Sequence, residues 1–399
     1  MHDPSSTTRP DPIRSPNKAA PTYLFLVTED WYFWSHRLPI ARAARDAGAR
    51  VIIATRVGEL RTAIEAEGFT LVPLPWRRRS DAPWNEARAL AEIVWLYRRE
   101  RPDVVHHVAI KPVVYGGIAA RLAGARAQVN AIAGFGYVET SRHPRARFLR
   151  GVFRAVLRFA WSGRGVHAIV QNDDDREALT RTGLLAPSHI HVIRGSGVDV
   201  TRFAPSREPD AARVRAVYAG RLLWSKGVRE LVDAARELRA RNARVDVVLV
   251  GSPDPENPES ISERTVQAWV SEGLVEHRPW TADMASVWRD AHIAVLPSYR
   301  EGLPKALLEA AASGRAIVAT DVPGCREIAR HDLTALCVPP RDARALADAI
   351  ERLAGDPALR ERLGAAGREL AVREYAEGIV VKETVDLYRL LCADAERRS

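Results

Sequence analysis

Short apolar runs alternate with longer amphipathic segments along almost the whole chain, and this alternation restricts the fold more than any other feature. Runs such as Val104–Val108 and Val245–Val250 are rich in β-branched side chains, which favours buried strands. Between them, segments such as Asn85–Glu100 and Ala343–Ala354 carry apolar residues at helical spacing. Regular alternation of strand and helix predicts an α/β fold in which helices cover both faces of a parallel sheet.

The alternation runs in two arrays, which predicts two Rossmann-like, doubly wound parallel-sheet domains facing each other across a cleft. A charged stretch near Thr201–Arg213, interrupted by Pro205 and Pro209, separates the arrays. A chain of 399 residues is long enough for two ordinary cores. We expect four parts: a disordered leader at 1–21, an N-terminal domain at 22–205, a C-terminal domain at 206–375 and a terminal helix at 376–399.

Three features bear on the cellular compartment. The first 21 residues are polar, hold five prolines and contain no apolar run, so we do not expect a signal peptide. No segment reaches the roughly 20 apolar residues that span a bilayer. The three cysteines, Cys325, Cys337 and Cys392, lack the spacing of a metal site. These features predict a cytoplasmic protein with at most surface attachment to a membrane.

The net charge of +9 is concentrated in one part of the chain. Residues 101–164 carry 11 basic and 2 acidic side chains, whereas residues 201–399 carry 30 and 31. A helix predicted over Arg145–Trp161 holds four arginines at spacings of three and four, hence on one face: Arg147, Arg150, Arg154 and Arg158. Such a basic amphipathic helix is typical of a surface that binds anionic membranes. The alternative is the solvated face of a helix whose apolar side is buried.

Ligands of doubly wound sheets bind beyond the carboxyl ends of the strands, so the strand-to-helix turns are the first places to examine. One turn follows a strand ending at Pro297 and carries Glu301 and then Gly302-Leu303-Pro304, which opens a helix. The unpaired backbone N–H groups of a helix N-terminus suit a diphosphate. Glu309, inside this helix, can accept two hydrogen bonds from the hydroxyls of a ribose. Taken singly, both glutamates are ordinary acidic residues, but the combination is specific.

A second turn begins the C-terminal domain and carries Gly220, Arg221 and Lys226 between a strand and a helix. Two fixed cations at this place would neutralise a departing nucleoside diphosphate. Lysine is rare here, with five among 59 basic residues, so Lys226 marks a candidate site for a compact point charge. Two surface cations without a function are the alternative.

The order Gly220-Arg221, Lys226-Gly227 and then Glu301 with Glu309 eight residues later resembles the retaining GT-B glycosyltransferases of family 4. Four further segments are similar to one bacterial subgroup, in which a hexose or hexosamine is added to a polyprenyl-diphosphate-linked saccharide. These segments are Ser35–Pro39, Ile110–Gly117, Asn130–Tyr137 and Pro297–Lys305. The resemblance covers nearly the whole chain after Pro21.

The resemblance implies a nucleotide-sugar donor, with UDP as the expected nucleotide. It implies that Arg221 and Lys226 bind the diphosphate, that Glu309 binds the ribose and that Glu301 contacts the transferred sugar. It further implies that the final helix crosses back onto the first domain and that the enzyme acts at the inner face of the bacterial plasma membrane. Because no carboxylate is placed as a nucleophile, we expect retention by same-face attack, with the departing diphosphate oxygen taking the acceptor proton.

Candidates in the first domain follow its central strands. The resemblance points to a strand-end histidine and to Lys111 as groups facing the cleft near the acceptor and the donor sugar. His106 and His107 are adjacent on a strand and must face opposite sides, so only one can reach the cleft, and we favour His106. A purely structural pair is the alternative. Asn130 and Gly134, at the next strand end, either shape the acceptor pocket or form a tight turn.

Two segments differ from what the family pattern leads one to expect. Many members carry a glycine-rich turn after the first strand, but Thr28–Trp34 occupies that place here and offers no such phosphate cradle. Asp173-Asp174-Asp175 formally contains the DxD of metal-dependent GT-A enzymes, but its position after Gln171-Asn172 suits the cap of a helix starting at Arg176. We expect neither a cofactor nor a required metal, because Arg221 and Lys226 serve the leaving group.

Two other functions remain open at this stage. A nucleotide-sugar 2-epimerase of the same fold would consume the donor without an acceptor, although the Gly-Leu-Pro turn with its paired glutamates weighs against it. A protein without enzymatic activity would use the basic helix to bind nucleic acid, with a steep salt dependence. We expect the transferase, and therefore no nucleic-acid partner.

Overall fold

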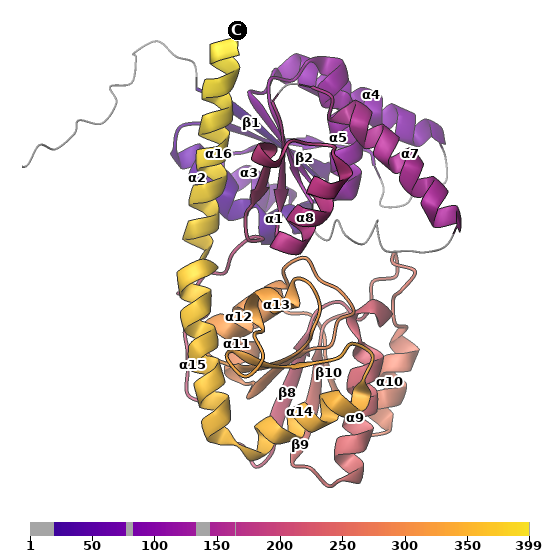
Figure 1. Cartoon of the computed structure of the whole chain (residues 1–399), viewed down its shortest axis with the longest axis vertical. Helices are drawn as coiled ribbons and strands as arrows, with labels where there is room; N and C mark the ends of the chain where they lie inside the picture. The colour runs from indigo at the N-terminus through magenta and orange to yellow at the C-terminus, as the bar shows by residue number, and fades with distance from the viewer. Residues whose placement is uncertain (1–19, 77–82, 133–143, 164, 399) are drawn as a thin grey trace, which may run out of the picture.

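A computed structural model describes residues 20–76, 83–132, 144–163 and 165–398, and the side chains at 83, 144–150 and 152 fall outside the description. Within these residues the strands form two separate sheets, and helices flank each sheet (Figure 1). All strand pairs in both sheets are parallel. The predicted α/β class with two doubly wound sheets is confirmed.

The first sheet has the strand order β3-β2-β1-β4-β5-β6-β7. Its strands are β1 (Thr22–Glu29), β2 (Arg50–Arg56), β3 (Thr70–Pro73), β4 (Val104–Val108), β5 (Gln128–Ala131), β6 (Val166–Val170) and β7 (Ile190–Val192). All five residues of β4 and of β6 are buried, because helices cover both faces of the sheet. This double coverage is why the strands appear in the sequence as continuous apolar runs.

The two faces of the first sheet carry different helices. One face packs against α4 (Pro83–Glu100), α5 (Ile110–Ala123), α7 (Pro144–Ala160) and α8 (Asp173–Thr182). The other packs against α1 (Asp30–His36), α2 (Leu38–Asp46), α3 (Arg61–Ala66) and the C-terminal α16 (Glu377–Arg398). The carboxyl ends of the strands lie at the edge nearer the second sheet, and the turns at that edge carry the candidate residues of the first domain.

The second sheet has the order β10-β9-β8-β11-β12-β13. Its strands are β8 (Val214–Ala219), β9 (Val245–Val250), β10 (Glu276–Arg278), β11 (Ile293–Leu296), β12 (Ala316–Thr320) and β13 (Ala335–Val338). Its helices are α9 (Val228–Ala240), α10 (Glu263–Ser271), α11 (Met284–Arg289), α12 (Lys305–Ala312), α13 (Cys325–Ile328), α14 (Ala343–Gly355) and α15 (Pro357–Glu374). Short 3-10 turns lie at Pro187–His189 and Trp224–Lys226.

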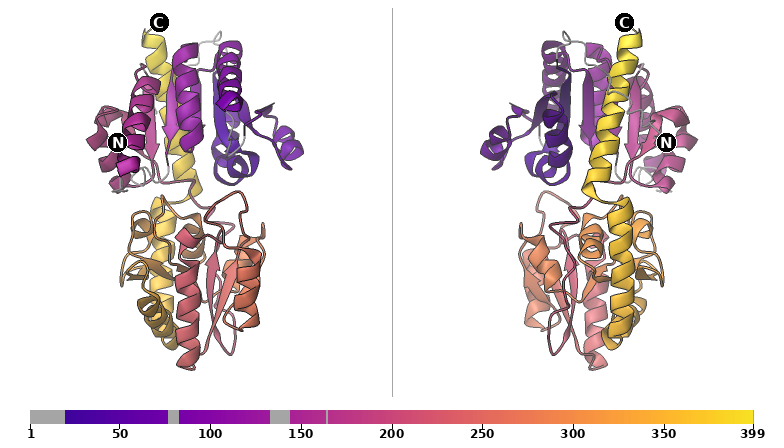
Figure 2. Two further views of the ribbon diagram at one scale, coloured as in Figure 1. Left: turned by 90° about the vertical axis from the view of Figure 1, so that its right-hand side faces the viewer. Right: turned by 90° about the vertical axis from the view of Figure 1, so that its left-hand side faces the viewer.

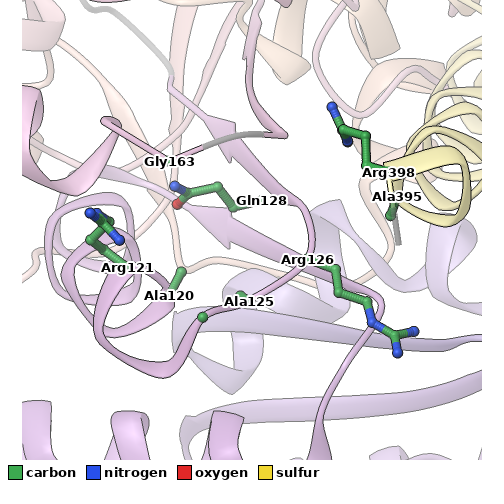
Figure 3. Close-up of a pocket in the computed structure, with 9 residues that line it drawn as sticks. Ala120, Arg121, Ala125, Arg126, Gln128, Gly163, Ala395 and Arg398 are labelled. Atoms are coloured by element: carbon green, nitrogen blue, oxygen red, sulfur yellow. The ribbon is translucent and has the colours of Figure 1, made fainter.

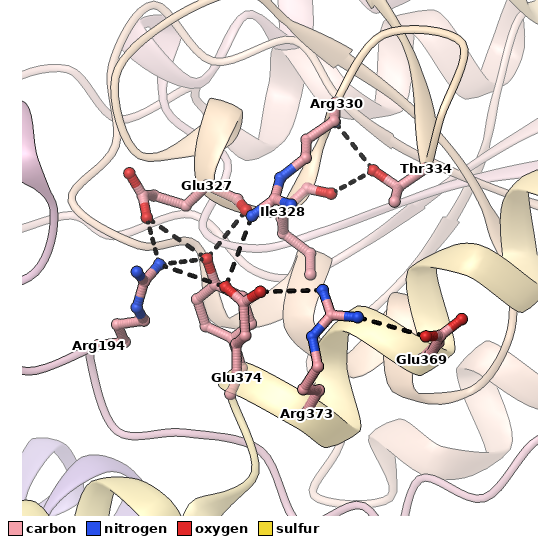
Figure 4. Close-up of polar contacts among 9 residues, drawn as sticks. Arg194, Glu327, Ile328, Arg330, Thr334, Glu369, Arg373 and Glu374 are labelled. Carbon is pink, nitrogen blue, oxygen red and sulfur yellow. Dashed lines mark hydrogen bonds and ion pairs between the residues drawn. The ribbon is translucent and has the colours of Figure 1, made fainter.

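The chain passes between the two sheets twice, and the two crossings lie side by side. The Val198 N–H donates to the carbonyl of Tyr375 (2.9 Å), and the Glu377 N–H donates to the carbonyl of Val198 (2.9 Å). Arg194, on the first crossing, contacts Glu327 (2.8 Å) and the Tyr375 hydroxyl (2.8 Å), within the network of Figure 4. These contacts join the linker to the helix pair that returns to the first domain.

After this junction, α16 runs along the first sheet, in line with α15 below it (Figure 2). Val380, Leu387, Tyr388 and Leu391 of α16 belong to the same apolar core as Phe25 of β1. The last helix therefore shares its hydrophobic core with the first half of the chain, although nearly 200 residues separate it from β7. The domain boundaries at 205/206 and 375/376 stay predictions.

The segment Thr28–Trp34 contains the end of a strand and the start of a helix. β1 continues to Glu29 and α1 begins at Asp30, whose carboxylate accepts hydrogen bonds from three backbone N–H groups, those of Trp31, Gly58 and Leu60. The helix expected to start at Arg176 starts earlier. Helix α8 begins at Asp173, three residues before Arg176. Its cap is the Asn172 side chain, which accepts from the Asp175 N–H (2.8 Å). The three aspartates occupy the first turn, where the helix dipole favours negative charge.

Candidate active site

The two turns singled out in the C-terminal domain follow neighbouring strands. β8 and β11 pair at the centre of the second sheet, and the chain leaves them toward opposite edges, β9 on one side and β12 on the other. Such a point of divergence leaves a crevice at the carboxyl ends of the strands. Gly220, Arg221 and Lys226 follow β8, whereas Glu301 follows β11. The topology therefore places both turns at one crevice.

Lys226 and Glu301 form an ion pair across this crevice. Lys226 Nζ lies 2.6 Å from Glu301 Oε1, and the Ser298 hydroxyl donates to the same oxygen at 2.6 Å. Gly227 makes this approach possible: its φ is 69°, and a Cβ there would lie 2.0 Å from the carbonyl oxygen of Pro297. The carboxylate thus holds the ammonium in place at the mouth of the crevice.

Arg221 lies at the rim of the same crevice. Its side chain is about half exposed, and its guanidinium pairs with Asp254 at 3.0 Å. The Tyr218 hydroxyl donates to the Arg221 carbonyl (2.7 Å) and so fixes the backbone after the strand. Gly220 closes the strand by donating to the carbonyl of Val250. Asp254 and Ser298 were not predicted from the sequence, because neither lies at a recognisable distance along the chain from its partner.

Glu309 is buried behind the start of α12. Its side chain is 9% exposed and accepts a hydrogen bond from Trp288 Nε1 (3.3 Å), with Lys305 Nζ 3.9 Å away. Burial raises the pKa of Glu309 above its usual value, and the nearby ammonium opposes part of that rise. Pro304 is the cap and Lys305 the first helical residue, one position later than expected. Glu309 therefore lies inside the second turn of α12.

Residues 302–305 contact the first domain at three points. Asn172 Nδ2, at the start of α8, donates to the carbonyl of Gly302 (2.9 Å). A Cβ on Gly195 would lie only 3.1 Å from the Leu303 side chain, so these residues are in close contact. Lys305 Nζ donates to the carbonyl of Ser35, at the end of α1 (2.7 Å). The loop that opens α12 is thus a main point of contact between the domains.

His106 does not face an open cleft as expected. Its ring is 2% exposed, and Nδ1 makes a short hydrogen bond to the Tyr388 hydroxyl of α16. Burial, assisted by the charges of Arg37 and His107, lowers the pKa of His106 well below its usual value. The physical reason is that β4 is a central strand covered by helices on both faces. Side chains that point to either face of β4 are therefore buried in a core.

His107 and Asn130 lie inside the first domain, not at an acceptor pocket. His107 Nδ1 lies 2.8 Å from Asn130 Oδ1, and its Nε2 lies 3.0 Å from the Tyr97 hydroxyl. Asn130 Nδ2 donates to the carbonyl of His167 (3.2 Å). Both side chains are fully buried, and their polar groups are satisfied within the domain. The contacts of His107 therefore support a purely structural role better than a role in binding the acceptor.

Lys111 lies at the carboxyl edge of the first sheet, near the start of α5. Its ammonium is 2.8 Å from Glu86 Oε1 and lies 5.8 Å and 5.5 Å from the ring centroids of Trp76 and Tyr115. Burial, together with a hydrogen bond to Glu86, raises the pKa of Tyr115 to about 12. Lys111 is thus paired within its domain, at the edge where an acceptor would enter. Gly134 lies outside the described residues.

The predicted basic helix exists as α7. Arg154 and Arg158 are exposed, whereas Leu157 and Ala160 pack into the core. Phe159, beside the arginines, is 48% exposed. The side chains of Arg147 and Arg150 lie outside the described part of the structure. Within that part, the chain contains no helix of the length and apolarity that membrane crossing requires.

Two further features of the described residues do not add to the site: possible metal ligands, and a pocket in the first domain. Over the described ranges, His, Cys, Asp and Glu side chains nowhere gather in a group of three that could hold a metal ion. A pocket of about 300 Å³ lies at the opposite, amino-terminal edge of the first sheet, next to Arg121, Gln128 and Arg398 (Figure 3). It contains none of the residues expected to act on a donor or an acceptor.

Two family models match the chain, one in each half. Glycosyl transferase 4-like matches residues 23–170, and Glycosyl transferases group 1 matches residues 213–356. One curated relative is N,N'-diacetylbacillosaminyl-diphospho-undecaprenol alpha-1,3-N-acetylgalactosaminyltransferase of Campylobacter jejuni. It is 25% identical over 364 residues, which are 88% of this chain and 94% of the relative. The putative glycosyltransferase EpsD of Bacillus subtilis is 27% identical over 388 residues, which are 92% and 95% of the two chains.

Solved structures share the fold at lower identity. A glycosyltransferase from Rickettsia africae superposes with a TM-score of 0.75 at 16% identity, over 94% of this chain and 99% of that one. HepE of Anabaena, solved in complex with UDP, gives a TM-score of 0.72 at 17% identity, over 92% and 99%. Because a glycosyltransferase model describes each half and the two-sheet fold is that of solved glycosyltransferases, the chain belongs to the GT-B glycosyltransferases of family 4.

Proposed function

We propose that the protein transfers a hexose or an N-acetylhexosamine from a UDP-linked donor to a hydroxyl of a lipid-linked saccharide, with retention of the anomeric configuration. The observation that carries this proposal is the meeting of Lys226 and Glu301 at the crevice of the second sheet, 2.6 Å apart, with Arg221 at its rim. A diphosphate and the sugar attached to it need this pairing of cation and carboxylate at one place.

The comparisons support the two substrates. The relative from Campylobacter jejuni is named for an acceptor in which a sugar is joined to undecaprenol through a diphosphate, and for the transfer of N-acetylgalactosamine. HepE of Anabaena binds UDP in a fold that superposes on this chain. A relative from Staphylococcus aureus is named for capsular polysaccharide biosynthesis. We therefore place this enzyme in the assembly of a cell-envelope glycan.

The proposed reaction assigns a role to each side chain of the crevice. Arg221 and Lys226 stabilise the charge that develops on the diphosphate as its bond to the sugar C1 breaks. To do so, Lys226 turns from Glu301 toward the phosphate, which frees Glu301 to bind hydroxyls of the sugar. Glu309 binds the ribose of the nucleotide. These roles follow from charge and position, and they need neither a cofactor nor a metal.

The acceptor hydroxyl attacks on the face from which the diphosphate departs. A new bond forms between the acceptor oxygen and C1 while the bond from C1 to the diphosphate oxygen breaks. The acceptor proton passes to the departing oxygen, so no enzymic base is needed. Lys111, at the carboxyl edge of the first sheet, is the candidate for orienting the acceptor. It would bind the acceptor's diphosphate in exchange for Glu86.

We also propose that α7 holds the enzyme at the inner face of the plasma membrane, where such an acceptor is embedded. Exposed Arg154 and Arg158 would contact anionic head groups, and Phe159 would enter the interface. This surface belongs to the first domain, the side from which a lipid-linked acceptor would approach.

Thermal unfolding in the presence of UDP, GDP or ADP tests the donor. When the three are compared at one concentration, the preferred nucleotide gives the largest rise in Tm, and a nucleotide at 100 times its dissociation constant adds about 2.7 kcal/mol of stability. A transfer assay with a polyprenyl-diphosphate-linked acceptor, followed by NMR of the new anomeric proton, tests the reaction and its stereochemistry. An unchanged Tm with all three nucleotides, together with no transfer, would contradict the proposal.

A further inference from the structure

The end of α1 faces the start of α12 across the domain boundary. Lys305 Nζ donates to the carbonyl of Ser35 at 2.7 Å, and His36 and Arg37 follow directly in the chain. Lys305 also opens the helix whose N-terminal turn carries the candidate diphosphate site. The short segment Ser35–Arg37 therefore directly contacts the residue that opens this helix.

This junction carries more positive than negative charge. Arg37 is 4% exposed. Among the described residues, its guanidinium donates only to the carbonyls of His36 and Gly195 (3.2 Å and 3.3 Å), and its Nε has no partner there. Over the described residues, no carboxylate lies within ion-pair distance of Arg37. The carboxylate nearest Lys305 is Glu309 at 3.9 Å. A buried cation without a counter-charge is costly, and an anionic ligand would supply the missing charge.

The His36 ring is held in a fixed orientation in the same place. It stacks on Tyr32, with ring centroids 4.2 Å apart and an angle of 11° between the planes. Its Nδ1 lies 2.6 Å from Ser35 Oγ, and that hydroxyl donates to the Trp31 carbonyl at 2.8 Å. Ser35 Oγ is therefore the acceptor for an Nδ1–H of His36, and His36 Nε2 is left for another partner.

Burial and three cations, Lys305, Arg37 and Arg221, lower the pKa of His36 to about 3. No carboxylate acts on His36 strongly enough to oppose them. Arg221 comes from the turn after β8, so the same small volume is approached by cations from both domains. A phosphate oxygen beside these cations would offset their field. His36 would then take up a proton from solvent and donate from Nε2 to the phosphate, while Nδ1–H keeps its hydrogen bond to Ser35 Oγ.

We propose that His36 and Lys305 complete the donor diphosphate site from the first domain, with buried Arg37 behind them, in place of a glycine-rich turn after the first strand. The inference rests on the proposed nucleotide-sugar donor. In the structure, Lys305 Nζ donates to the Ser35 carbonyl. When the donor binds, Lys305 and His36 contact the diphosphate, so the phosphates join the two domains.

Comparison of UDP with uridine tests the site, because only UDP carries the phosphates. Isothermal titration should show that Lys305→Met and His36→Phe each weaken UDP binding about tenfold while leaving uridine binding unchanged. His36→Gln, which keeps a side-chain N–H donor, should recover most of the lost affinity. Lys382→Met, on the exposed face of α16, is the matched control and should change neither constant.

The possible results separate this inference from the proposed function. If wild-type protein binds UDP and Lys226→Ala weakens it, but the His36 and Lys305 variants bind UDP normally, the first-domain site is wrong and the donor assignment stands. If the variants lose UDP binding and uridine binding to the same extent, the residues stabilise the fold and do not contact the phosphates. That result also overturns the inference. If wild-type protein binds no nucleotide, both proposals fail. Should His36→Phe not fold, His36→Asn and Lys305→Met carry the test.

Discussion

Lys226 Nζ lies 2.6 Å from Glu301 Oε1, across two turns that are 75 residues apart in the chain. The pair joins the ends of β8 and β11, and the Ser298 hydroxyl fixes the shared carboxylate oxygen. In this structure the two charges satisfy each other. Under the proposed function, a donor diphosphate would compete with Glu301 for Lys226, so donor binding would release the carboxylate toward the sugar.

The first prediction concerns Lys226. We expect Lys226→Ala to lower the rate of sugar transfer at least about 100-fold, because the leaving diphosphate loses a fixed cation. Steady-state kinetics with purified protein and a lipid-linked acceptor measures the effect. Lys382→Ala removes an exposed lysine of α16 and should keep full activity. A Lys226→Ala enzyme with wild-type kcat/KM would contradict the role given to this cation.

The second prediction concerns Glu309 and the ribose. Glu309→Ala should abolish most turnover and weaken uridine binding about tenfold, because a carboxylate that accepts from the ribose hydroxyls is lost. Alanine suits a helix, so the fold should remain intact. Titration with 2′,3′-dideoxyuridine gives the decisive comparison: its affinity should not change with the substitution. Glu361→Ala, on an exposed helix face, is the control, and an equal loss for both nucleosides would exclude ribose recognition.

The third prediction concerns acid stability. The pKa of buried His107 is lowered to about 4, below the ordinary 6.5, chiefly by burial. The unfolded chain therefore takes up a proton first, and stability falls as the pH drops from about 6.5 to about 4, by roughly 3 kcal/mol for this residue. Urea unfolding across this range should show a shallower pH dependence for His107→Gln than for wild type. Parallel curves would mean that His107 does not titrate as described.

The fourth prediction concerns the docking of α16. Tyr388→Phe removes the hydroxyl that bonds His106 Nδ1 and leaves a buried polar atom without a partner. We expect a loss of about 1–3 kcal/mol in the free energy of unfolding. In a His106→Leu background the same substitution should cost much less, because the partner is already gone. Equal costs in both backgrounds would show that the hydrogen bond contributes nothing.

The fifth prediction concerns the membrane surface. Arg154→Glu with Arg158→Glu should weaken binding to vesicles rich in anionic lipid by at least about 30-fold, since each basic residue near the surface contributes about 1 kcal/mol. Activity on a short soluble acceptor should be spared. Arg344→Glu with Arg352→Glu, on α14 of the second domain, makes the same change in net charge elsewhere. Equal vesicle binding by both double variants would show that the basic face of α7 is an ordinary solvated surface.

Much of the fold follows from local patterns in the sequence. Buried parallel strands need apolar side chains on both faces, so each appears as a continuous run. The runs Val104–Val108 and Val245–Val250 coincide with β4 and β9. The helix within Thr28–Trp34 was harder to recognise from the sequence, because Trp31, Phe33 and Trp34 do not show the polar face of an ordinary helix. The turn residues Arg221, Lys226 and Glu301 were found because the order of strand, turn and helix sets their position along the chain.

By itself, the sequence determined two parallel sheets and the turns that hold the donor candidates, since strand periodicity and helix starts depend on neighbours in the chain. Only the tertiary structure decided that His106 and His107 are both buried, because burial depends on which helices cover β4, including α16 from the far end of the chain. It also decided that Lys305 meets Ser35. That contact spans 270 residues and depends on how the two domains pack, which no local pattern encodes.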